Sequence, residues 1–149
     1  MKETAPTRSY ELTPERSLYI SAQLYSFMVA YKSFLHPQYS IHDLSNSINI
    51  PSYQLSAFLN RELGYNFNDY LNRLRIGHCQ KLMKSGAVDQ LNMHGLAFEC
   101  GFHNRNSFTT AFKKFTGRTP SDYLKSLSRS GVPPEPDLPS IINTGVYNP

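Results

Sequence analysis

The 149-residue sequence has no tryptophan and only two cysteines, Cys79 and Cys100. Neither cysteine has a second sulfur or a histidine at zinc-like spacing, and both lie among apolar residues. This favours reduced core thiols, with a disulfide or a metal ligand as the alternatives. The five histidines are scattered, and there is no H-E-x-x-H pair, Gly-rich phosphate loop or nucleophile elbow. The sequence therefore predicts neither a metal centre nor a cofactor, and no enzyme.

Long apolar runs are also missing. No stretch reaches the roughly 18 to 20 apolar residues that a bilayer-spanning helix needs. The most apolar stretch, residues 18–31, is interrupted by Ser21, Gln23 and Ser26, and residues 1–15 have no apolar signal core. We expect one compact domain with loosely ordered ends, because a chain of this length buries a single core.

The net charge is +4, and the positive charge is concentrated in two blocks. Residues 61–84 hold five Lys or Arg against two Asp or Glu, and residues 101–125 hold five against one. Such blocks fit binding to nucleic acid or to another anionic surface. The alternative is the solvated surface of ordinary helices.

The spacing of apolar residues predicts an all-α fold of about seven helices. Apolar residues recur at three- and four-residue steps, and no stretch alternates for long enough to form a strand. The first helix is expected from about Glu15 to Leu35, before His36-Pro37 ends it. Its apolar residues are Leu18, Leu24, Tyr25, Met28, Tyr31 and Leu35.

Cap residues mark a pair of short helices after this lead-in. Ser40 followed by Asp43 is the signature of a helix start, and this helix is expected over residues 41–48. The Asn49-Ile50-Pro51 break leads to a third helix over about residues 52–63, which Gly64 ends. Asn66 and Asp69 then begin a longer fourth helix, expected over about residues 66–85.

A second pair of helices follows. The fifth is expected over about residues 91–100 and the sixth from the Asn104 cap to about Lys114, with a turn at Gly101 between them. A cap at Thr119 and Pro120 opens a seventh helix, which is expected to reach about Leu127. The phenylalanines at helical spacing, which are expected in the core, are Phe58, Phe67, Phe102 and Phe112.

The two ends have the composition of unstructured segments. Residues 1–14 are expected to be a flexible lead, followed by the lead-in helix over residues 15–39. Residues 129–149 are rich in proline, which predicts a disordered tail. Docking of Ile141, Ile142 or Tyr147 on the domain is the alternative for this tail.

Each helix pair has the layout of a helix-turn-helix, in which the second helix enters a DNA major groove while the first braces it. The first unit spans about residues 41–63 and the second about residues 91–114. Leu55 and Phe108 hold equivalent places in the second helix of each pair and are 53 residues apart in number. The fourth helix, between them, is able to hold both readers about 34 Å apart, so that one monomer reads adjacent grooves.

Residues 101–123 carry a motif that resembles a known family. They read Gly101-Phe102-His103-Asn104-Arg105-Asn106-Ser107-Phe108-Thr109-Thr110-Ala111-Phe112-Lys113-Lys114-Phe115-Thr116-Gly117-Arg118-Thr119-Pro120-Ser121-Asp122-Tyr123. The Gly-Phe turn, the Phe-Lys-Lys stretch and the Gly-x-Thr-Pro cap resemble, in this order, the second helix-turn-helix unit of the AraC/XylS transcription regulators. Residues 43–64 and 66–75 resemble the first unit and linker helix of that family, so the resemblance covers about residues 40–128.

The resemblance implies a setting for the domain. The Asn66-Phe67-x-x-Tyr70-Leu71-Asn72 and Ala97-Phe98-Glu99-x-Gly101-Phe102 runs are similar to members fused to an amino-terminal membrane or sensory region. We therefore expect a fragment that lacks its signal-receiving part. The implied location is the bacterial cytoplasm, with the cytoplasmic part of a membrane-anchored protein as the alternative, and the implied partners are double-stranded DNA and RNA polymerase. No small-molecule site is evident.

The resemblance also implies which residues touch DNA. The expected base contacts are Tyr53, Ser56, Ala57, Arg105, Asn106, Thr109 and Thr110. Arg pairs with guanine and Asn with adenine in bidentate fashion, so the second helix is the better-equipped reader. The expected phosphate contacts, which position a protein without specifying sequence, are Asn60, Arg61, Arg73, Lys113 and Lys114.

Each of these assignments has a plain structural alternative. The cations are alternatively solvated helix surface, Arg105 and Asn106 an ordinary first helical turn, and Tyr53 a ring packed on the linker helix. For the whole chain the alternatives are a helical module that binds a partner protein and a nonspecific architectural DNA-binding protein. Specific duplex binding with a steep salt dependence separates the first from gene regulation, and sequence preference separates the second.

Overall fold

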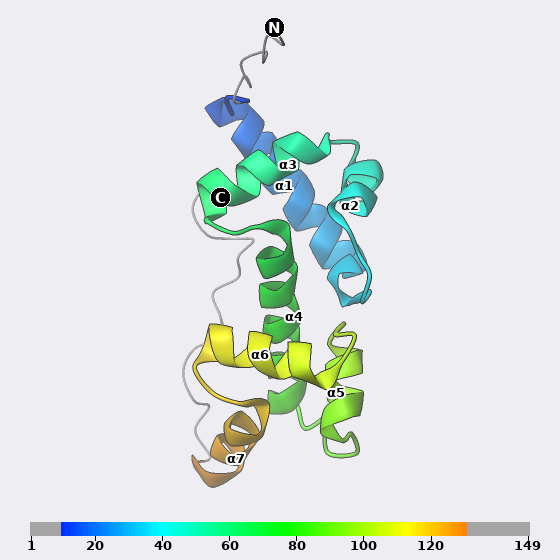
Figure 1. The fold of residues 1–149 in the computed structure, drawn as a ribbon, viewed down its shortest axis with the longest axis vertical. Helices are drawn as coiled ribbons and strands as arrows, with labels where there is room; N and C mark the ends of the chain where they lie inside the picture. The colour runs from blue at the N-terminus through cyan, green and yellow to red at the C-terminus, as the bar shows by residue number, and fades with distance from the viewer. Residues whose placement is uncertain (1–9, 131–149) are drawn as a thin grey trace, which may run out of the picture.

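The computed structural model describes residues 10–130, and all regular structure within that range is helical (Figure 1). The elements are α1 (Pro14–Tyr31), η1 (Ser33–Leu35), α2 (Ile41–Ile48), α3 (Ser52–Phe58), η2 (Leu59–Leu63), α4 (Phe67–Lys84), α5 (Met93–Glu99), α6 (Arg105–Thr116) and α7 (Pro120–Ser130). The predicted all-α fold with seven α-helices is confirmed. Residues 129 and 130, which the sequence assigns to the disordered tail, belong to α7, because the helix continues past Leu127; the rest of the predicted tail lies outside the described residues.

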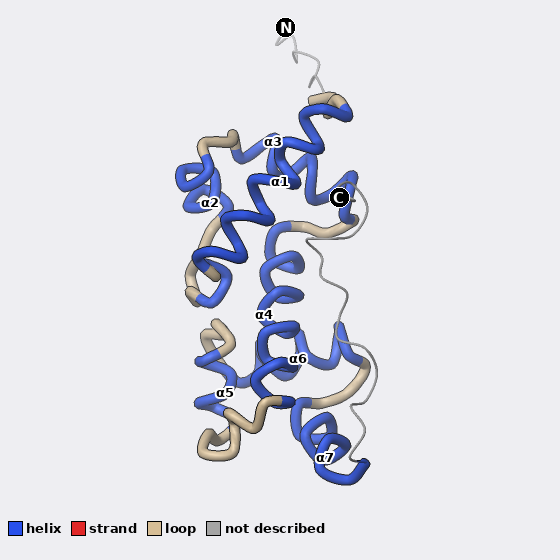
Figure 2. The backbone as a smooth tube through the Cα atoms, turned by 180° about the vertical axis from the view of Figure 1, so that it is seen from behind, coloured by secondary structure: helices blue, strands red, loops and turns tan. Residues whose placement is uncertain are grey.

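Helix α4 is the spine of the molecule, with one group of helices at each of its ends (Figure 1, and Figure 2 from behind). Its first half contributes Tyr70 and Leu71 to a core with α1, α2 and α3. Its second half contributes Ile76, Cys79 and Met83 to a core with α5, α6 and α7. One rigid helix therefore connects two small hydrophobic cores.

The caps predicted from the sequence are present. The Ser40 side chain accepts from the Asp43 main-chain N–H at 3.2 Å, and Asp43 Oδ2 accepts from the Ser40 N–H at 2.8 Å. The side chains of Asn66 and Asn104 accept from the N–H of the third helical residue in α4 and α6. Asn92, which the sequence analysis missed, caps α5 in the same way. Each cap satisfies a donor that a helix start leaves without an intrahelical partner.

The Ser40 cap leads to a testable prediction. Hydrogen bonds from the Ser40 side chain and main chain lower the pKa of Asp43 below its ordinary value of 3.8. The stabilisation that Asp43 gives is therefore present at neutral pH and is lost as the pH falls through this lowered pKa. Ser40→Ala is expected to destabilise the fold by about 1 kcal/mol at pH 7. Urea unfolding at pH 7 and pH 2.5 checks this, and a difference from the parent that does not shrink in acid contradicts it.

Helix α1 is shorter than predicted. It ends at Tyr31 because Lys32 adopts the left-handed conformation (φ 47°), and a single 3₁₀ turn, η1, replaces the expected continuation to Leu35. Several residues of its predicted apolar stripe are exposed, namely Leu18, Tyr25 and Tyr31. The buried residues of α1 are Ser17, Ile20, Ser21, Leu24 and Met28.

The corner after α1 is held by one buried arginine of α4. Arg75 donates from Nε to the Phe34 carbonyl oxygen at 2.6 Å and from Nη2 to the His36 carbonyl oxygen at 2.9 Å. Its Nη1 donates to Asn72 Oδ1 at 3.1 Å, and its guanidinium lies 5.6 Å from the ring centroid of Phe102. Arg75 therefore connects the corner of the first group of helices to the turn of the second.

Gly101 brings the same corner against the turn between α5 and α6. Its φ is +85°, and a Cβ built on it lies 2.8 Å from Leu35 Cα and 2.9 Å from the Phe34 oxygen. Real Cβ atoms do not approach backbone so closely, so this contact requires glycine. The two groups of helices thus touch through main chain as well as through α4.

The two cysteines lie in the second core. Cys79 and Cys100 are buried free thiols, as predicted. A hydrogen bond between the two side chains, together with burial, raises the pKa of the Cys79 thiol. Cys79 therefore packs as a neutral side chain at neutral pH.

Within residues 10–130, no helix is both long enough and apolar enough to cross a bilayer.

Candidate nucleic-acid interface

Helices α3 and α6 lie across the same face of the molecule, one at each end of α4. In Figure 1, α3 crosses in front of α1 and α6 crosses in front of α4, and the chain runs in the same direction through α3 and α6. Each follows another short helix, α2 or α5, after a tight turn. This is the arrangement of two helix-turn-helix units with their second helices on a common side.

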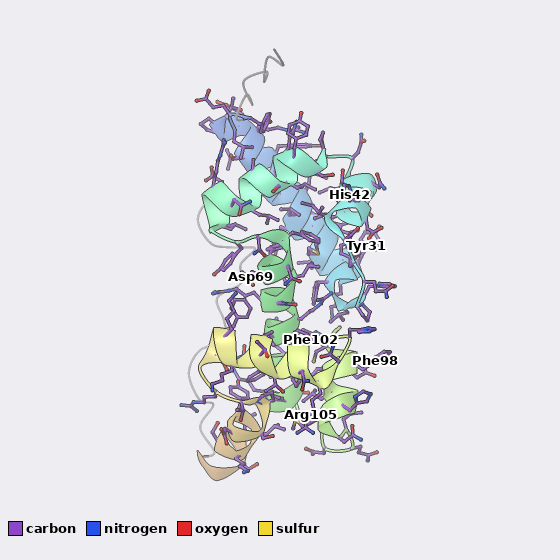
Figure 3. The ribbon with its side chains drawn as sticks, in the orientation of Figure 1. Tyr31, His42, Asp69, Phe98, Phe102 and Arg105 are labelled. Atoms are coloured by element: carbon purple, nitrogen blue, oxygen red, sulfur yellow. The ribbon has the colours of Figure 1, made fainter. Side chains whose placement is uncertain are left out.

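Packing decides which side of α6 faces outward. Phe108, Ala111 and Phe112 are buried, and the Phe112 ring lies 5.4 Å from that of Tyr123 on α7. Arg105 begins the helix and is exposed (Figure 3). The predicted contact residues of α6 that lie away from the buried side are Arg105, Asn106, Thr109, Thr110 and Lys113. Of these only Thr109 is half-buried.

Helix α3 and its extension η2 repeat this pattern. Leu55, Phe58 and Leu59 are buried, at positions 53 residues before Phe108, Ala111 and Phe112. The predicted contact residues on the other side are Tyr53, Ser56, Ala57, Asn60 and Arg61, which precede Asn106, Thr109, Thr110, Lys113 and Lys114 by the same 53 residues. The two helices therefore present equivalent positions to the outside.

Residues 10–13 border the outward side of α3. The sequence assigns them to a flexible segment, but the Tyr10 ring packs edge-on against Tyr53, with centroids 5.1 Å apart. Arg61 Nη1 donates to the Tyr10 carbonyl oxygen. The Tyr53 ring, 58% exposed, therefore packs on this segment rather than on the linker helix, which corrects the alternative raised from the sequence.

Asn60 is turned toward its own helix. Its Nδ2 donates to the Ser56 carbonyl oxygen at 2.9 Å and lies 3.4 Å from Ser56 Oγ. Both residues were predicted to meet DNA, as a phosphate and a base contact. In the free chain Asn60 and Ser56 are joined by this hydrogen bond. A DNA phosphate therefore has to compete with the Ser56 carbonyl oxygen for the Asn60 side chain.

Two predicted phosphate contacts have partners inside the protein. Arg73 donates from Nη1 to the Tyr65 hydroxyl, and its guanidinium lies over the rings of Tyr65 and Phe115. Lys114 Nζ is 2.7 Å from Asp69 Oδ1, near the start of α4 (Figure 3). The Arg73 contacts join α4 to Tyr65, in the loop before α4, and to Phe115 on α6. The Lys114–Asp69 ion pair also joins α6 to α4. Lys113, one residue earlier on α6, is exposed and is not ion-paired within residues 10–130.

One contact that the sequence analysis missed braces α3 from behind. Arg16 Nε on α1 donates to Gln54 Oε1 at 2.8 Å, and the Arg16 guanidinium lies 4.9 Å from the Tyr19 ring centroid. Gln54 in turn donates to the Tyr53 hydroxyl at 3.2 Å. No local sequence signal predicts this series of contacts, because Arg16 and Gln54 are 38 residues apart.

Comparison with known proteins identifies the family. The model of a helix-turn-helix domain matches residues 44–126, more than half of the chain and both helix pairs. The chain belongs to the AraC/XylS family of DNA-binding transcription regulators. The resemblance noted in the sequence is thereby confirmed.

Relatives of known type support the same placement. The HTH-type transcriptional activator RhaR of Yersinia pseudotuberculosis is 26% identical over 117 residues, which cover 78% of this chain and 39% of RhaR. The uncharacterized HTH-type transcriptional regulator YijO of Escherichia coli is 36% identical over 75 residues, 50% of this chain and 25% of YijO. The chain thus spans well under half the length of these two relatives.

Solved structures share the fold. The C-terminal domain of AraT, a response regulator from Geobacillus stearothermophilus, superposes with a TM-score of 0.58 at 25% identity and covers 78% of this chain and 88% of that one. A Listeria innocua protein of unknown function gives a TM-score of 0.60 at 28% identity, covering 72% and 96%. Both therefore match this AraC/XylS domain over most of its described length.

Proposed function

We propose that this chain binds a specific double-stranded DNA site as a monomer, with α3 and α6 in adjacent major grooves. The observation that carries the proposal is the placement of both helices, in the same sense, across one face of the molecule (Figure 1). Adjacent major grooves on one face of B-DNA are about 34 Å apart. A spine that holds two readers in a fixed relation suits such a site, which needs no two-fold symmetry.

Helix α6 is the main reader in this proposal. Arg105 and Asn106 are exposed in its first turn, where a recognition helix meets base edges. Thr109 and Thr110 lie one turn further along the same side. Because a bidentate Arg or Asn contact discriminates by about 1 to 3 kcal/mol, most sequence specificity resides here.

Helix α3 reads more by shape. Its outward residues Tyr53, Ser56 and Ala57 offer a ring, a hydroxyl and a methyl group, which suit contact with a thymine methyl. Asn60, Arg61 and Lys113 are placed on the outward sides of the two helices for phosphates. Arg73 and Lys114, whose contacts join α4 to α6, contribute to the fit mainly by holding these two helices together.

Selection of bound duplexes from a random pool tests the proposal directly. The expected product is an asymmetric site with two conserved segments about one helical turn apart, and the segment read by α6 is the more strongly conserved. Binding that falls steeply with salt and shows no sequence preference indicates an architectural role instead. No duplex binding at all indicates a module that binds a partner protein.

Two substitutions on α6 are expected to behave differently. Arg105→Ala is expected to weaken binding to the selected site by about 1 to 3 kcal/mol and to relax preference at one base position. Lys113→Ala is expected to weaken specific and random duplexes alike and to reduce the slope of log K against log salt by about 1. Gel-shift titrations at three salt concentrations measure both. Equal losses on specific and random duplex for Arg105→Ala contradict its role.

The remaining parts of the regulator are proposed on the strength of the family. Relatives such as RhaR are more than twice as long as the matched segment. We therefore propose that a sensory region belongs to the same protein, that the domain works in the bacterial cytoplasm, and that it acts on RNA polymerase. Recovery of the complete reading frame tests the first point, and transcription in vitro from a promoter carrying the selected site tests the last.

A further inference from the structure

Helix α1 carries an apolar stripe that the rest of the described chain leaves open. Leu18, Ala22, Tyr25 and Val29 follow one another at steps of four, three and four residues. This spacing keeps them in one line along a helix, as in the seam of a coiled coil. Leu18, Tyr25 and Val29 are 45%, 41% and 53% exposed, and Ala22 is half-buried.

The stripe is separate from the side of α1 that forms the core. The core side is made of Ser17, Ile20, Ser21, Leu24 and Met28. Figure 2, from behind, shows α1 in front, whereas α3 crosses in front of it in Figure 1. A partner seated along the open flank of α1 therefore leaves the outward side of α3 accessible.

The stripe is complementary to itself when reversed. A two-fold axis between Gln23 and Leu24 makes two pairs within the helix, Leu18 with Val29 and Ala22 with Tyr25, and a third at its ends, Glu15 with the C-cap residue Lys32. The large ring of Tyr25 meets the small side chain of Ala22, and the exposed charges at the two ends meet with opposite sign. In a parallel pair the same charges meet with equal sign, which costs free energy. The pattern therefore selects an antiparallel second copy of this chain.

We propose that two copies of this chain associate through antiparallel α1 helices, with Leu18, Ala22, Tyr25 and Val29 as the seam. Four residues from each copy make a small seam beside the roughly 20 to 30 residues that each side contributes to a standard interface. The dimer is therefore weak in free solution and forms where two copies are brought together. Its two-fold axis places two reading faces in inverted orientation, so it suits two copies of the monomer site arranged as an inverted repeat. The association itself does not depend on the proposed DNA binding.

Sedimentation equilibrium of the full chain over a wide concentration range tests the seam. The parent chain is expected to show a monomer–dimer equilibrium, and Val29→Glu is expected to be monomeric at every concentration. Val29 is exposed, so circular dichroism and thermal unfolding of Val29→Glu should match the parent. Tyr31→Glu, which alters a still more exposed apolar residue outside the seam, is the matched control and should dimerise like the parent. A parent chain that stays monomeric throughout overturns the proposal.

Charge reversal and cross-linking test whether the two α1 helices run antiparallel. Glu15→Lys alone is expected to weaken the dimer, and Glu15→Lys with Lys32→Glu is expected to restore it. A mixture of Leu18→Cys and Val29→Cys chains should form a disulfide under mild oxidation, whereas Leu18→Cys alone should not. In the antiparallel pair two copies of residue 18 are about 16 Å apart along the axis, beyond the roughly 7 Å limit of a disulfide. Because Cys79 and Cys100 are buried, the parent is the blank. Cross-linking of Leu18→Cys with itself overturns the antiparallel arrangement.

Discussion

Gly101→Ala is expected to destabilise the chain by about 3 to 5 kcal/mol. Two costs combine. A non-glycine residue at φ +85° costs on the order of 1 to 3 kcal/mol in backbone strain. Its Cβ also meets the main chain of Leu35 and Phe34 at 2.8 to 2.9 Å, which forces the α1 corner away from the α5–α6 turn and costs about 1 to 3 kcal/mol more. Few single substitutions reach this range.

Gly64 provides the matched control. Its φ is +73°, yet a Cβ built there meets nothing within 4 Å. Gly64→Ala therefore carries only the backbone cost, on the order of 1 kcal/mol. Urea unfolding of both variants measures the difference, provided that the slope of free energy against denaturant is the same in each. A Gly101→Ala loss no greater than that of Gly64→Ala would show that the corner gives way easily.

The order of the helices could be predicted from the sequence because the signals that set it are local. Ser40 with Asp43, and Asn66 and Asn104, each cap a helix through a hydrogen bond to a residue three positions on. The end of α1 could not be predicted in the same way. Lys32 has no sequence signature for a left-handed turn, and the corner that follows is held by Arg75, which is about forty positions away.

The outward sides of α3 and α6 were predictable for a similar reason. Once Leu55 and Phe108 are recognised as core, helical geometry fixes which of their neighbours face away. Contacts between distant segments were not predictable. Nothing local in the sequence indicates that Tyr10 lies against Tyr53, that Lys114 pairs with Asp69, or that Arg16 reaches α3. These contacts decide how firmly each reader is held.

The contact between the two groups of helices has a functional meaning beyond stability. A duplex presents its grooves at a fixed spacing, so the affinity of a two-reader monomer depends on how well the relative placement of α3 and α6 is maintained. Helix α4 alone fixes their separation along its axis. The corner after α1 adds a second point of contact between the two groups of helices. Arg75 donates to the Phe34 and His36 carbonyl oxygens there, and Gly101 lies against the main chain of Phe34 and Leu35. Two points of contact restrain bending that one helix permits.

Arg75→Met is expected to destabilise the fold by about 1 to 3 kcal/mol and to weaken binding to the full DNA site by more than tenfold. Methionine keeps much of the apolar volume but has no donor, so the Phe34 carbonyl oxygen loses its Arg75 partner and the His36 carbonyl oxygen keeps only the Tyr39 N–H, at 3.2 Å. Each buried acceptor left unsatisfied costs about 1 to 3 kcal/mol. Removing a buried cation also removes its desolvation cost, which offsets part of this loss. The net effect stays unfavourable because the carbonyls remain where they are.

Arg75→Lys separates the charge from the hydrogen bonds. Lysine keeps the cation but lacks the planar fork that reaches both carbonyls at once, so it should recover only part of the stability. Spin labels at Ser56→Cys and Thr109→Cys report the distance between the readers. For Arg75→Met this distance distribution should broaden, and affinity should fall for a site spanning both grooves but not for a half-site read by α6 alone. The contrary result is a distance distribution as narrow as the parent's together with equal losses of affinity for the full site and the half-site. It would mean that α4 by itself fixes the placement of α3 relative to α6, and that the corner only adds stability.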